Sequence, residues 1–201
     1  MTAFFVSGPH GCGKTTLIEK LISHDSRFAE LPFEIDFLKS FANFKNLGHW
    51  ERCLVRLYHR SYLTALAHQL PGDQIYAVSR GIRDSEAYIR AYARLGWISP
   101  EETKMLSWIL ENPTAPTPTV LLLPPLETVL SRLHGRREQG VRRERDAIFN
   151  HEDGEEFTAE LWRQFAAMAQ REDVLVLEDN EDDDIQKLME WLKGIEHANR
   201  G

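Results

Sequence analysis

Residues 3–15 read AFFVSGPHGCGKT, and this stretch decides the fold. An apolar run at 3–6, typical of a buried strand, is followed by Ser7 and then by residues 8–15, which fit the pattern G-x-x-x-x-G-K-[ST] at every fixed position. A helical pattern begins directly after it. Glycines let backbone N–H groups converge on phosphate oxygens, and the N-terminus of the following helix adds the positive end of its dipole. The stretch therefore predicts a phosphate-binding loop between a strand and a helix.

The motif assigns roles by position. Lys14 is expected to reach the β and γ phosphates of a nucleoside triphosphate, and the hydroxyl of Thr15 to ligate Mg²⁺ between them. The guanine-selective motif Asn-Lys-x-Asp is absent from the sequence, so ATP is the expected donor. The predicted nucleotide-binding residues are Gly8, Pro9, His10, Gly11, Cys12, Gly13, Lys14, Thr15 and Thr16.

Short runs of Val, Ile, Leu and Phe alternate with longer helical patterns along the chain, which predicts an α/β sandwich around a parallel sheet. The length favours one domain, residues 1–201. Strands are expected at 3–7, 31–37, 74–79, 120–124 and 174–177, and helices at 13–22, 49–70, 84–95, 99–110, 126–138, 157–170 and 185–195. The helix at 99–110 has the clearest start, because Ser99 and Glu102 form a capping-box pattern around Pro100.

The net charge, the cysteine content and the distribution of apolar residues restrict the partners and the cellular compartment that we expect for this protein. The formal net charge of −7 disfavours an extended nucleic-acid-binding surface. Cys12 and Cys53 are the only cysteines, and Cys12 lies in the phosphate loop, so a reducing compartment is expected and a disulfide framework is not. The sequence has no basic leader and no apolar run of membrane-spanning length, which favours a cytoplasmic protein without a membrane partner.

With Gly11 also a glycine and Thr16 following, the loop resembles that of thymidylate kinases and deoxynucleoside kinases. The resemblance implies a P-loop NTPase three-layer sandwich, with a five-stranded parallel sheet and a helical arginine-rich lid. It also implies an acceptor base at the end of the second strand, where Glu34 lies twenty positions after Lys14. Asp36 projects to the same side of an extended strand and is the second candidate. An ordinary half-buried strand with acids facing water explains the same alternation.

The third expected strand ends in residues 76–81, YAVSRG, which resembles a segment of these kinases that carries an acid and an arginine. The resemblance makes Arg80 the shared arginine, whose fixed fork suits a phosphate in transfer. A surface ion pair is the other interpretation of Arg80. Ser79 stands where the family has an acid that helps to organise Mg²⁺, and Asp84 is the candidate substitute, acting through a water.

Residues 130–137, LSRLHGRR, with Arg142, Arg143 and Arg145, resemble the arginine-rich lid of this family, which places a lid at about 132–150. Arg132 and Arg136 are one helical turn apart and are the expected pair acting on the transferred phosphoryl group. Six arginines and no lysine between 132 and 145 favour planar phosphate recognition over a solvated basic helix, the alternative interpretation.

The acceptor is less well defined, because the glutamine that reads the base in deoxynucleoside kinases has no equivalent near residues 58–60. An aromatic-lined acceptor site is expected from Phe37, Phe41, Phe44, Trp50, Tyr58 and Tyr62, most of which should be core. The favoured function is transfer of the γ-phosphoryl group of Mg-ATP to a nucleoside or nucleotide. A kinase of another small molecule or of a nucleotide within DNA, and a nucleotide-binding ATPase subunit with a second acidic motif at 178–179, are the alternatives. The sequence does not tell whether two chains pair as a homodimer.

Overall fold

The computed structural model of the chain describes residues 3–31, 46–70, 73–111, 118–140, 152, 154–179 and 182–198. Its centre is a sheet in which every neighbouring pair of strands is parallel. The spatial order is β2-β3-β1-β4-β5. The strands are β1 (Ala3–Ser7), β2 (Phe28–Leu31), β3 (Ile75–Ser79), β4 (Thr119–Leu122) and β5 (Val174–Leu177).

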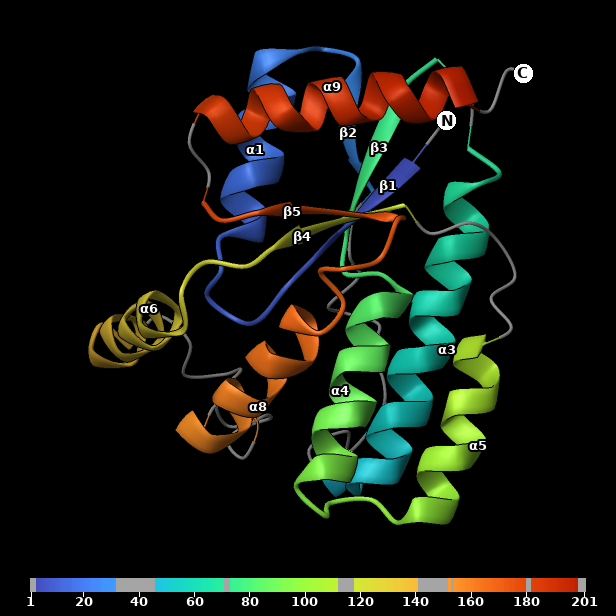
Figure 1. Cartoon of the computed structure of the whole chain (residues 1–201), viewed down its shortest axis with the longest axis vertical. Coiled ribbons are helices and arrows are strands. Elements are labelled where there is room, and N and C mark those ends of the chain that lie inside the picture. The colour runs from blue at the N-terminus through green and yellow to red at the C-terminus, as the bar shows by residue number, and fades with distance from the viewer. Residues whose placement is uncertain are drawn as a thin grey trace.

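Helices lie on both faces of the sheet and make a three-layer architecture (Figure 1). One face is covered by α1 (Lys14–His24) and α9 (Asp182–Ala198). The other carries α3 (His49–Ala67), α4 (Ile82–Arg94), α5 (Pro100–Glu111) and α8 (Glu155–Ala166). The remaining described helix, α6 (Leu126–Glu138), lies beyond the carboxyl end of β4.

Successive side chains of the central strand β1 point to opposite faces of the sheet, and each set packs against a different layer of helices. Phe4 and Val6 belong to the apolar cluster that includes α1 and α9, whereas Phe5 packs with β3 and α3 on the opposite side. All five residues of β1 are buried. A parallel strand covered on both faces is not alternately polar, which is why residues 3–6 form one continuous apolar run.

The α/β class, the five parallel strands and the helices on both faces confirm the fold expected from the sequence. The bounds of β1 and β5 are those predicted, and Ser99 and Glu102 form both capping-box hydrogen bonds, at 2.6 and 3.2 Å. The predicted start of β2 was wrong by three residues. The strand occupies 28–31 instead of beginning at 31, and most of the expected range, 32–37, lies outside the described residues.

The physical reason for the earlier start of β2 is its packing. Phe28 lies edge-on to Phe4 of β1, with ring centroids 6.2 Å apart, and the backbone of Ile75 in β3 donates a hydrogen bond to the carbonyl of Arg27. Three helices also begin two or three residues before their expected starts: α4 at Ile82, α8 at Glu155 and α9 at Asp182. The acidic residues in these first turns are favoured by the helix dipole.

Within the described residues, none of the helices combines the length and the apolar composition needed to cross a lipid bilayer.

Candidate functional site

The phosphate loop connects β1 to α1 at the carboxyl end of the sheet. Gly8 has a φ of 141°, and a Cβ atom on it would lie 2.3 Å from the carbonyl oxygen of Leu122 in β4. Gly13, which immediately precedes α1, has a φ of 105° in the left-handed region. Both positions therefore favour glycine over residues with a side chain. Without side chains there, the turn stays narrow and its backbone N–H groups are accessible to a ligand.

Lys14 is folded into this loop. Its Nζ donates hydrogen bonds to the carbonyl oxygens of Gly8, at 2.7 Å, and of Pro9, at 2.9 Å. The Sγ of Cys12 lies 3.4 Å from the same nitrogen. Burial lowers the pKa of Lys14, with Cys12 the largest opposing influence. The ammonium group is thus held at the centre of the turn.

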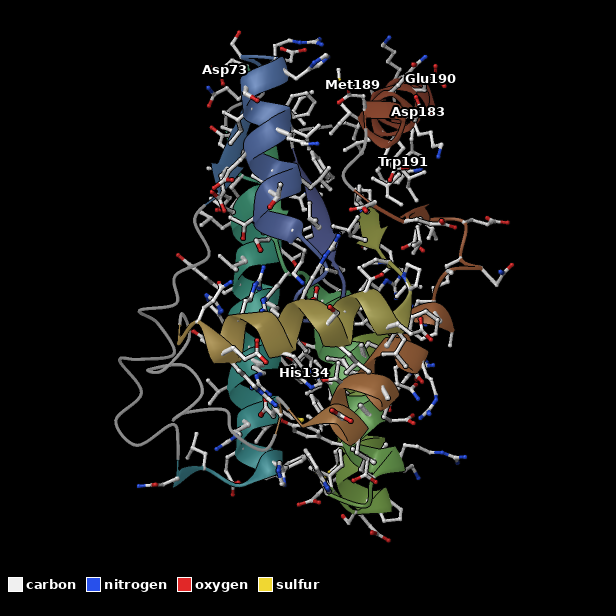
Figure 2. All side chains as sticks on the ribbon, turned by 90° about the vertical axis from the view of Figure 1, so that its left-hand side faces the viewer. Asp73, His134, Asp183, Met189, Glu190 and Trp191 are labelled. Atoms are coloured by element: carbon white, nitrogen blue, oxygen red, sulfur yellow. The ribbon has the colours of Figure 1, made fainter. Side chains whose placement is uncertain are left out.

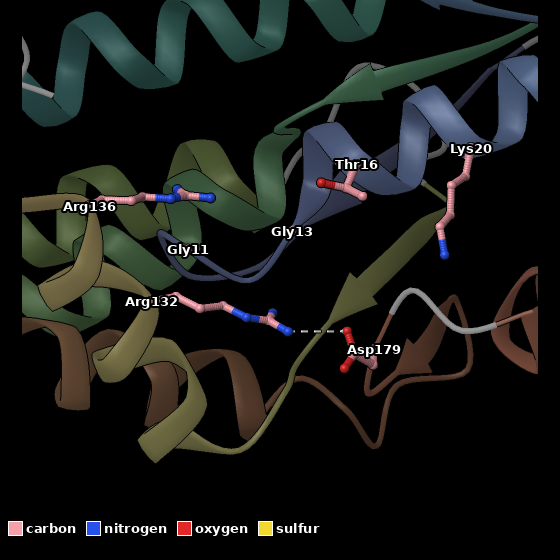
Figure 3. Close-up of a pocket in the computed structure, with 7 residues that line it drawn as sticks. All are labelled: Gly11, Gly13, Thr16, Lys20, Arg132, Arg136 and Asp179. Atoms are coloured by element: carbon pink, nitrogen blue, oxygen red, sulfur yellow. Dashed lines mark hydrogen bonds and ion pairs between the residues drawn. The ribbon is translucent and has the colours of Figure 1, made fainter. Parts of the chain in front are cut away.

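A pocket of about 380 Å³ opens beside the loop (Figure 3). It is lined by Gly11, Gly13, Thr16, Lys20, Arg132, Arg136 and Asp179. The side chains of Arg132 and Arg136 extend from α6 towards the loop, as Figure 3 shows. Arg132 donates to the carbonyl of Cys12, at 3.3 Å, and pairs with Asp179 at the same distance. Positive side chains from α1 and α6 thus surround the positive end of α1, an arrangement suited to an anion.

The helix that carries these arginines packs directly on the loop. A Cβ atom on Gly11 would lie 3.4 Å from Leu133 of α6 and 3.5 Å from the carbonyl oxygen of Val129. Figure 2 views the molecule from the side of α6 and shows the helix lying across it, with His134 labelled. Nε2 of His134 lies 3.0 Å from Oε1 of Glu155 in α8, and both side chains are exposed. The described part of the predicted lid is therefore helical to Glu138, while residues 141–150, with Arg142, Arg143 and Arg145, lie outside the described residues.

Arg80 also reaches the loop, from the end of β3. It follows β3 directly, and its Nη2 lies 3.1 Å from Nδ1 of His10 in the phosphate loop. The backbone of Arg80 has a φ of 72°, which is unusual for a residue other than glycine. The structure thus brings the predicted residues Arg80, Arg132 and Arg136 around one loop, from two separate elements.

Asp84, the expected indirect magnesium ligand, is fully buried near the start of α4. Its Oδ2 accepts hydrogen bonds from the hydroxyl of Ser7, at 2.6 Å, and from the backbone N–H of Gly81, at 3.0 Å. Its Oδ1 has no hydrogen-bond partner among the described residues. Thr15 is exposed at the start of α1. An exposed hydroxyl on the loop and an unsatisfied carboxylate oxygen are oxygen donors of the kind that suits Mg²⁺.

The sequence did not reveal a buried row of arginines on α3. Arg52, Arg56 and Arg60 are 4, 5 and 2% exposed and follow one another at helical spacing. Glu152 lies against the first two: its Oε1 is 3.2 Å from Arg52 and its Oε2 is 2.5 Å from Arg56. Tyr92 of α4 donates to Oε1 of the same carboxylate. The i, i+4, i+8 spacing of the arginines was readable in the sequence, but nothing in it identified the distant acid.

The third arginine of the row has different surroundings. Arg60 donates to the hydroxyl of Ser85, at 3.0 Å, and its guanidinium carbon lies 5.4 Å from the ring centre of Tyr88. No carboxylate of the described residues lies within ion-pair distance of it. Burial lowers the pKa of Arg60 to about 10, with Asp84 the largest influence in the other direction.

Several other site residues were also missed or lie outside the structure's description. Lys20 and Asp179 line the pocket, and Tyr88 contacts His10, although the sequence assigned none of them to the nucleotide. Asp179 was noted only as part of a possible second acidic motif. Tyr58 and Tyr62, two of the expected aromatic wall residues, are 66 and 54% exposed on α3. Glu34, Asp36, Phe37, Phe41 and Phe44 lie outside the described residues.

The phosphate loop, its lysine and the strand order define a P-loop fold of the β2-β3-β1-β4-β5 type. Comparison with protein-family models and with curated proteins found no match. Solved structures do match over nearly the whole chain. A deoxyadenosine kinase from M. mycoides with bound dATP is 16% identical, with a TM-score of 0.68, covering 96% of this chain and 100% of that one.

Two further structures give the same result. The M. mycoides deoxyadenosine kinase with the products dCMP and a flexible dCDP is 15% identical, with a TM-score of 0.71 and the same coverage. A thymidylate kinase from Candida albicans is 16% identical, with a TM-score of 0.69, covering 97% of this chain and 92% of that one. The chain therefore has the fold of the P-loop nucleoside and nucleotide kinases that its loop resembles.

Proposed function

We propose that the protein is a phosphotransferase that moves the γ-phosphoryl group of Mg-ATP to a nucleoside or nucleotide acceptor. The observation that carries this proposal is the convergence of Lys14, Arg80 and Arg132 on one phosphate loop, from α1, the end of β3 and α6. A transferring phosphoryl group spreads charge over its equatorial oxygens, so catalysis needs positioned positive groups on several sides. The nucleotides bound by the similar kinase structures support the choice of substrate.

In this proposal the loop N–H groups and Lys14 bind the β and γ phosphates, and Arg132 and Arg136 close over them from α6. Mg²⁺ would be held by the hydroxyl of Thr15 and, through a water, by the carboxylate of Asp84, and it would supply neutralisation of the phosphate charge. The acceptor oxygen forms a bond to the γ phosphorus while the bond to the β–γ bridging oxygen breaks, and ADP leaves. Where the acceptor is a hydroxyl, its proton passes to Glu34, with Asp36 as the alternative base.

Release of ADP from Mg-ATP tests the proposal when it is measured against nucleosides, nucleoside monophosphates and short single-stranded DNA. A kinase of the proposed type releases ADP in step with a phosphorylated nucleoside or nucleotide. Phosphorylation of DNA alone would assign the acceptor to a polynucleotide. ADP release that no acceptor in the panel stimulates would contradict the proposal.

One observation favours a hydrolysing subunit as a second candidate. Asp179, part of the acidic motif that such a protein needs, lines the loop pocket. It is, however, paired with Arg132, and it follows the edge strand β5, which β4 separates from β1. Because the carboxylate of Asp179 already pairs with Arg132, the transfer reaction is the better-supported function.

Glu34→Gln distinguishes hydroxyl from phosphate acceptors. A hydroxyl acceptor must lose a proton, so we expect transfer to a nucleoside to slow about 100-fold, whereas a monophosphate is already anionic and should react at an unchanged rate. The measurement is kcat with each acceptor at saturating Mg-ATP. An unchanged rate with a nucleoside would assign the base to Asp36, which the matching Asp36→Asn variant then tests.

Substitution of Arg136 separates its action on the transition state from simple attraction of ATP. Lysine keeps the charge without the planar fork, so Arg136→Lys should lower kcat about 10-fold and Arg136→Ala up to about 100-fold, with little change in KM for ATP. Arg137→Ala is the control, because Arg137 is exposed one position further along α6 and does not line the pocket. A lysine variant that matches the wild type, with a salt-dependent KM in the alanine variant, would assign Arg136 to attraction only.

A further inference from the structure

The third residue of the phosphate loop, His10, makes a specific contact on each ring nitrogen. Nδ1 lies 3.1 Å from Nη2 of Arg80, and Nε2 is hydrogen-bonded to the hydroxyl of Tyr88. A guanidinium group can only donate hydrogen bonds, so Nδ1 must be the acceptor and carries no proton. The proton of the neutral ring is then on Nε2 and is donated to Tyr88. The two contacts together specify one tautomer and one ring orientation.

Tyr88 is itself fixed, which makes it a firm support for His10. It is 2% exposed, and its ring packs against Phe157 of α8, with centroids 5.6 Å apart. The guanidinium carbon of Arg56 lies over the same ring, 4.6 Å from its centre. The imidazole is therefore held from α4, an element that does not belong to the phosphate loop.

Arg80 is held at two points, its main chain and its side chain. A non-glycine residue at a φ of 72° adopts a conformation that costs free energy and persists only where neighbouring groups impose it. Its backbone N–H is bonded to the carbonyl of Val6, at 2.9 Å, which holds the main chain. The contact with His10 orients the long side chain towards the loop.

We propose that His10 is a positioning residue, which holds the Arg80 guanidinium beside the phosphate loop in the orientation needed for the transferring phosphoryl group. The inference rests on the proposed function. An arginine side chain that is already oriented loses less rotational freedom as the transition state forms, so its contribution to the rate depends on the group that holds it. His10 thus acts through Arg80 and has no contact of its own with the phosphoryl group in this proposal.

Asn and Leu provide a matched test because they have nearly the same shape and differ in hydrogen bonding. The amide oxygen of His10→Asn can accept from Arg80 in place of Nδ1, whereas His10→Leu cannot. We expect His10→Leu to lower kcat about 10-fold or more with less than about a 3-fold change in KM for ATP, and His10→Asn to recover most of that loss. His24→Leu, at the exposed end of α1, is the control.

A double-mutant cycle distinguishes positioning from an independent role. If His10 acts through Arg80, adding His10→Leu to Arg80→Met should slow the enzyme by less than about 2-fold further. Full additivity of the two effects, equal rates for His10→Asn and His10→Leu, or an unchanged kcat in His10→Leu would overturn the proposal.

A spectroscopic measurement keeps this inference separate from the proposed function. Long-range ¹H–¹⁵N spectra of the histidine rings, with His10 assigned from the His10→Asn variant, should show a protonated Nε2 and an unprotonated Nδ1 whose signal shifts in Arg80→Met. A protonated Nδ1, or no shift in Arg80→Met, would show that His10 does not hold Arg80. A chain with the expected spectra but no phosphoryl transfer would instead overturn the proposed function and leave the contact established.

Discussion

Replacement of Lys14 by alanine should slow phosphoryl transfer by about 30-fold to 1,000-fold, because one group that stabilises charge in a transition state contributes about 2 to 4 kcal/mol. In the structure the Nζ of Lys14 is surrounded by loop oxygens, at 2.7 Å from Gly8 and 2.9 Å from Pro9. No other ammonium group lies within the turn among the described residues. A variant that keeps more than about one tenth of the wild-type rate would contradict this role for Lys14.

The comparison should include Lys14→Met, which preserves most of the volume of the buried side chain. Burial lowers the pKa of Lys14, so the charged form is disfavoured where it lies and loss of the charge should not unfold the protein. We expect both variants to unfold at denaturant concentrations close to that of the wild type, measured by tryptophan fluorescence. Lys187→Ala, on the exposed side of α9, controls for loss of one positive charge far from the loop.

The fold could be predicted because its decisive signals are local. A strand, the glycine-rich loop and a helix lie within residues 3–24, and the central strand is apolar from residue 3 to residue 6 because both faces are covered. The capping box at Ser99 and Glu102 likewise depends on residues three apart. The start of β2 was wrong because it depends on long-range packing of Phe28 against Phe4, which competes with the more regular alternation at 31–37.

In the candidate site, too, the residues that a local motif marks were predicted and the long-range contacts were not. Lys14 and the loop glycines were assigned by motif, whereas the contacts of His10 with Arg80 and Tyr88 connect residues 70 and 78 positions apart. Such pairs leave no spacing signal in one sequence. The buried arginines of α3 were hidden for another reason: arginine is usually exposed, so a helical stripe of this residue type indicates a solvated face until a buried acid is known to lie opposite.

Glu152→Ala should be the most destabilising single change within this buried cluster, by about 3 to 5 kcal/mol, since it leaves two buried guanidinium groups without their carboxylate. Domains of ordinary stability unfold with about 5 to 15 kcal/mol, so much of the total would be lost. The Glu152 side chain is fully buried, and it joins Arg52 and Arg56 of α3 to Tyr92 of α4. The measurement is urea unfolding followed by circular dichroism.

The control for this change is Glu155→Ala, three residues further along the chain. The Glu155 side chain is 66% exposed, and its partner His134 is 48% exposed, so the substitution should change stability by less than about 0.5 kcal/mol. Equal effects of the two substitutions would show that the buried cluster contributes no more than an exposed polar contact.

Acid unfolding tests whether Glu152 acts as a carboxylate. Burial alone would raise its pKa, but Arg56, with Tyr92 and Arg52, holds the pKa below its usual range. Because the folded-state pKa of Glu152 is below its unfolded-state pKa, the ionised form stabilises the protein above about pH 4.3, and this stabilisation is lost as the pH falls towards the folded-state pKa.

The Glu152→Gln variant provides the comparison, because its side chain does not titrate. The stability gap between wild type and Glu152→Gln should be widest near pH 7 and narrow by about 1.4 kcal/mol per pH unit below about 4.3. A gap that stays constant down to pH about 3 would mean that Glu152 contributes through shape and hydrogen bonding, and that its charge has no part in holding α3 to α4.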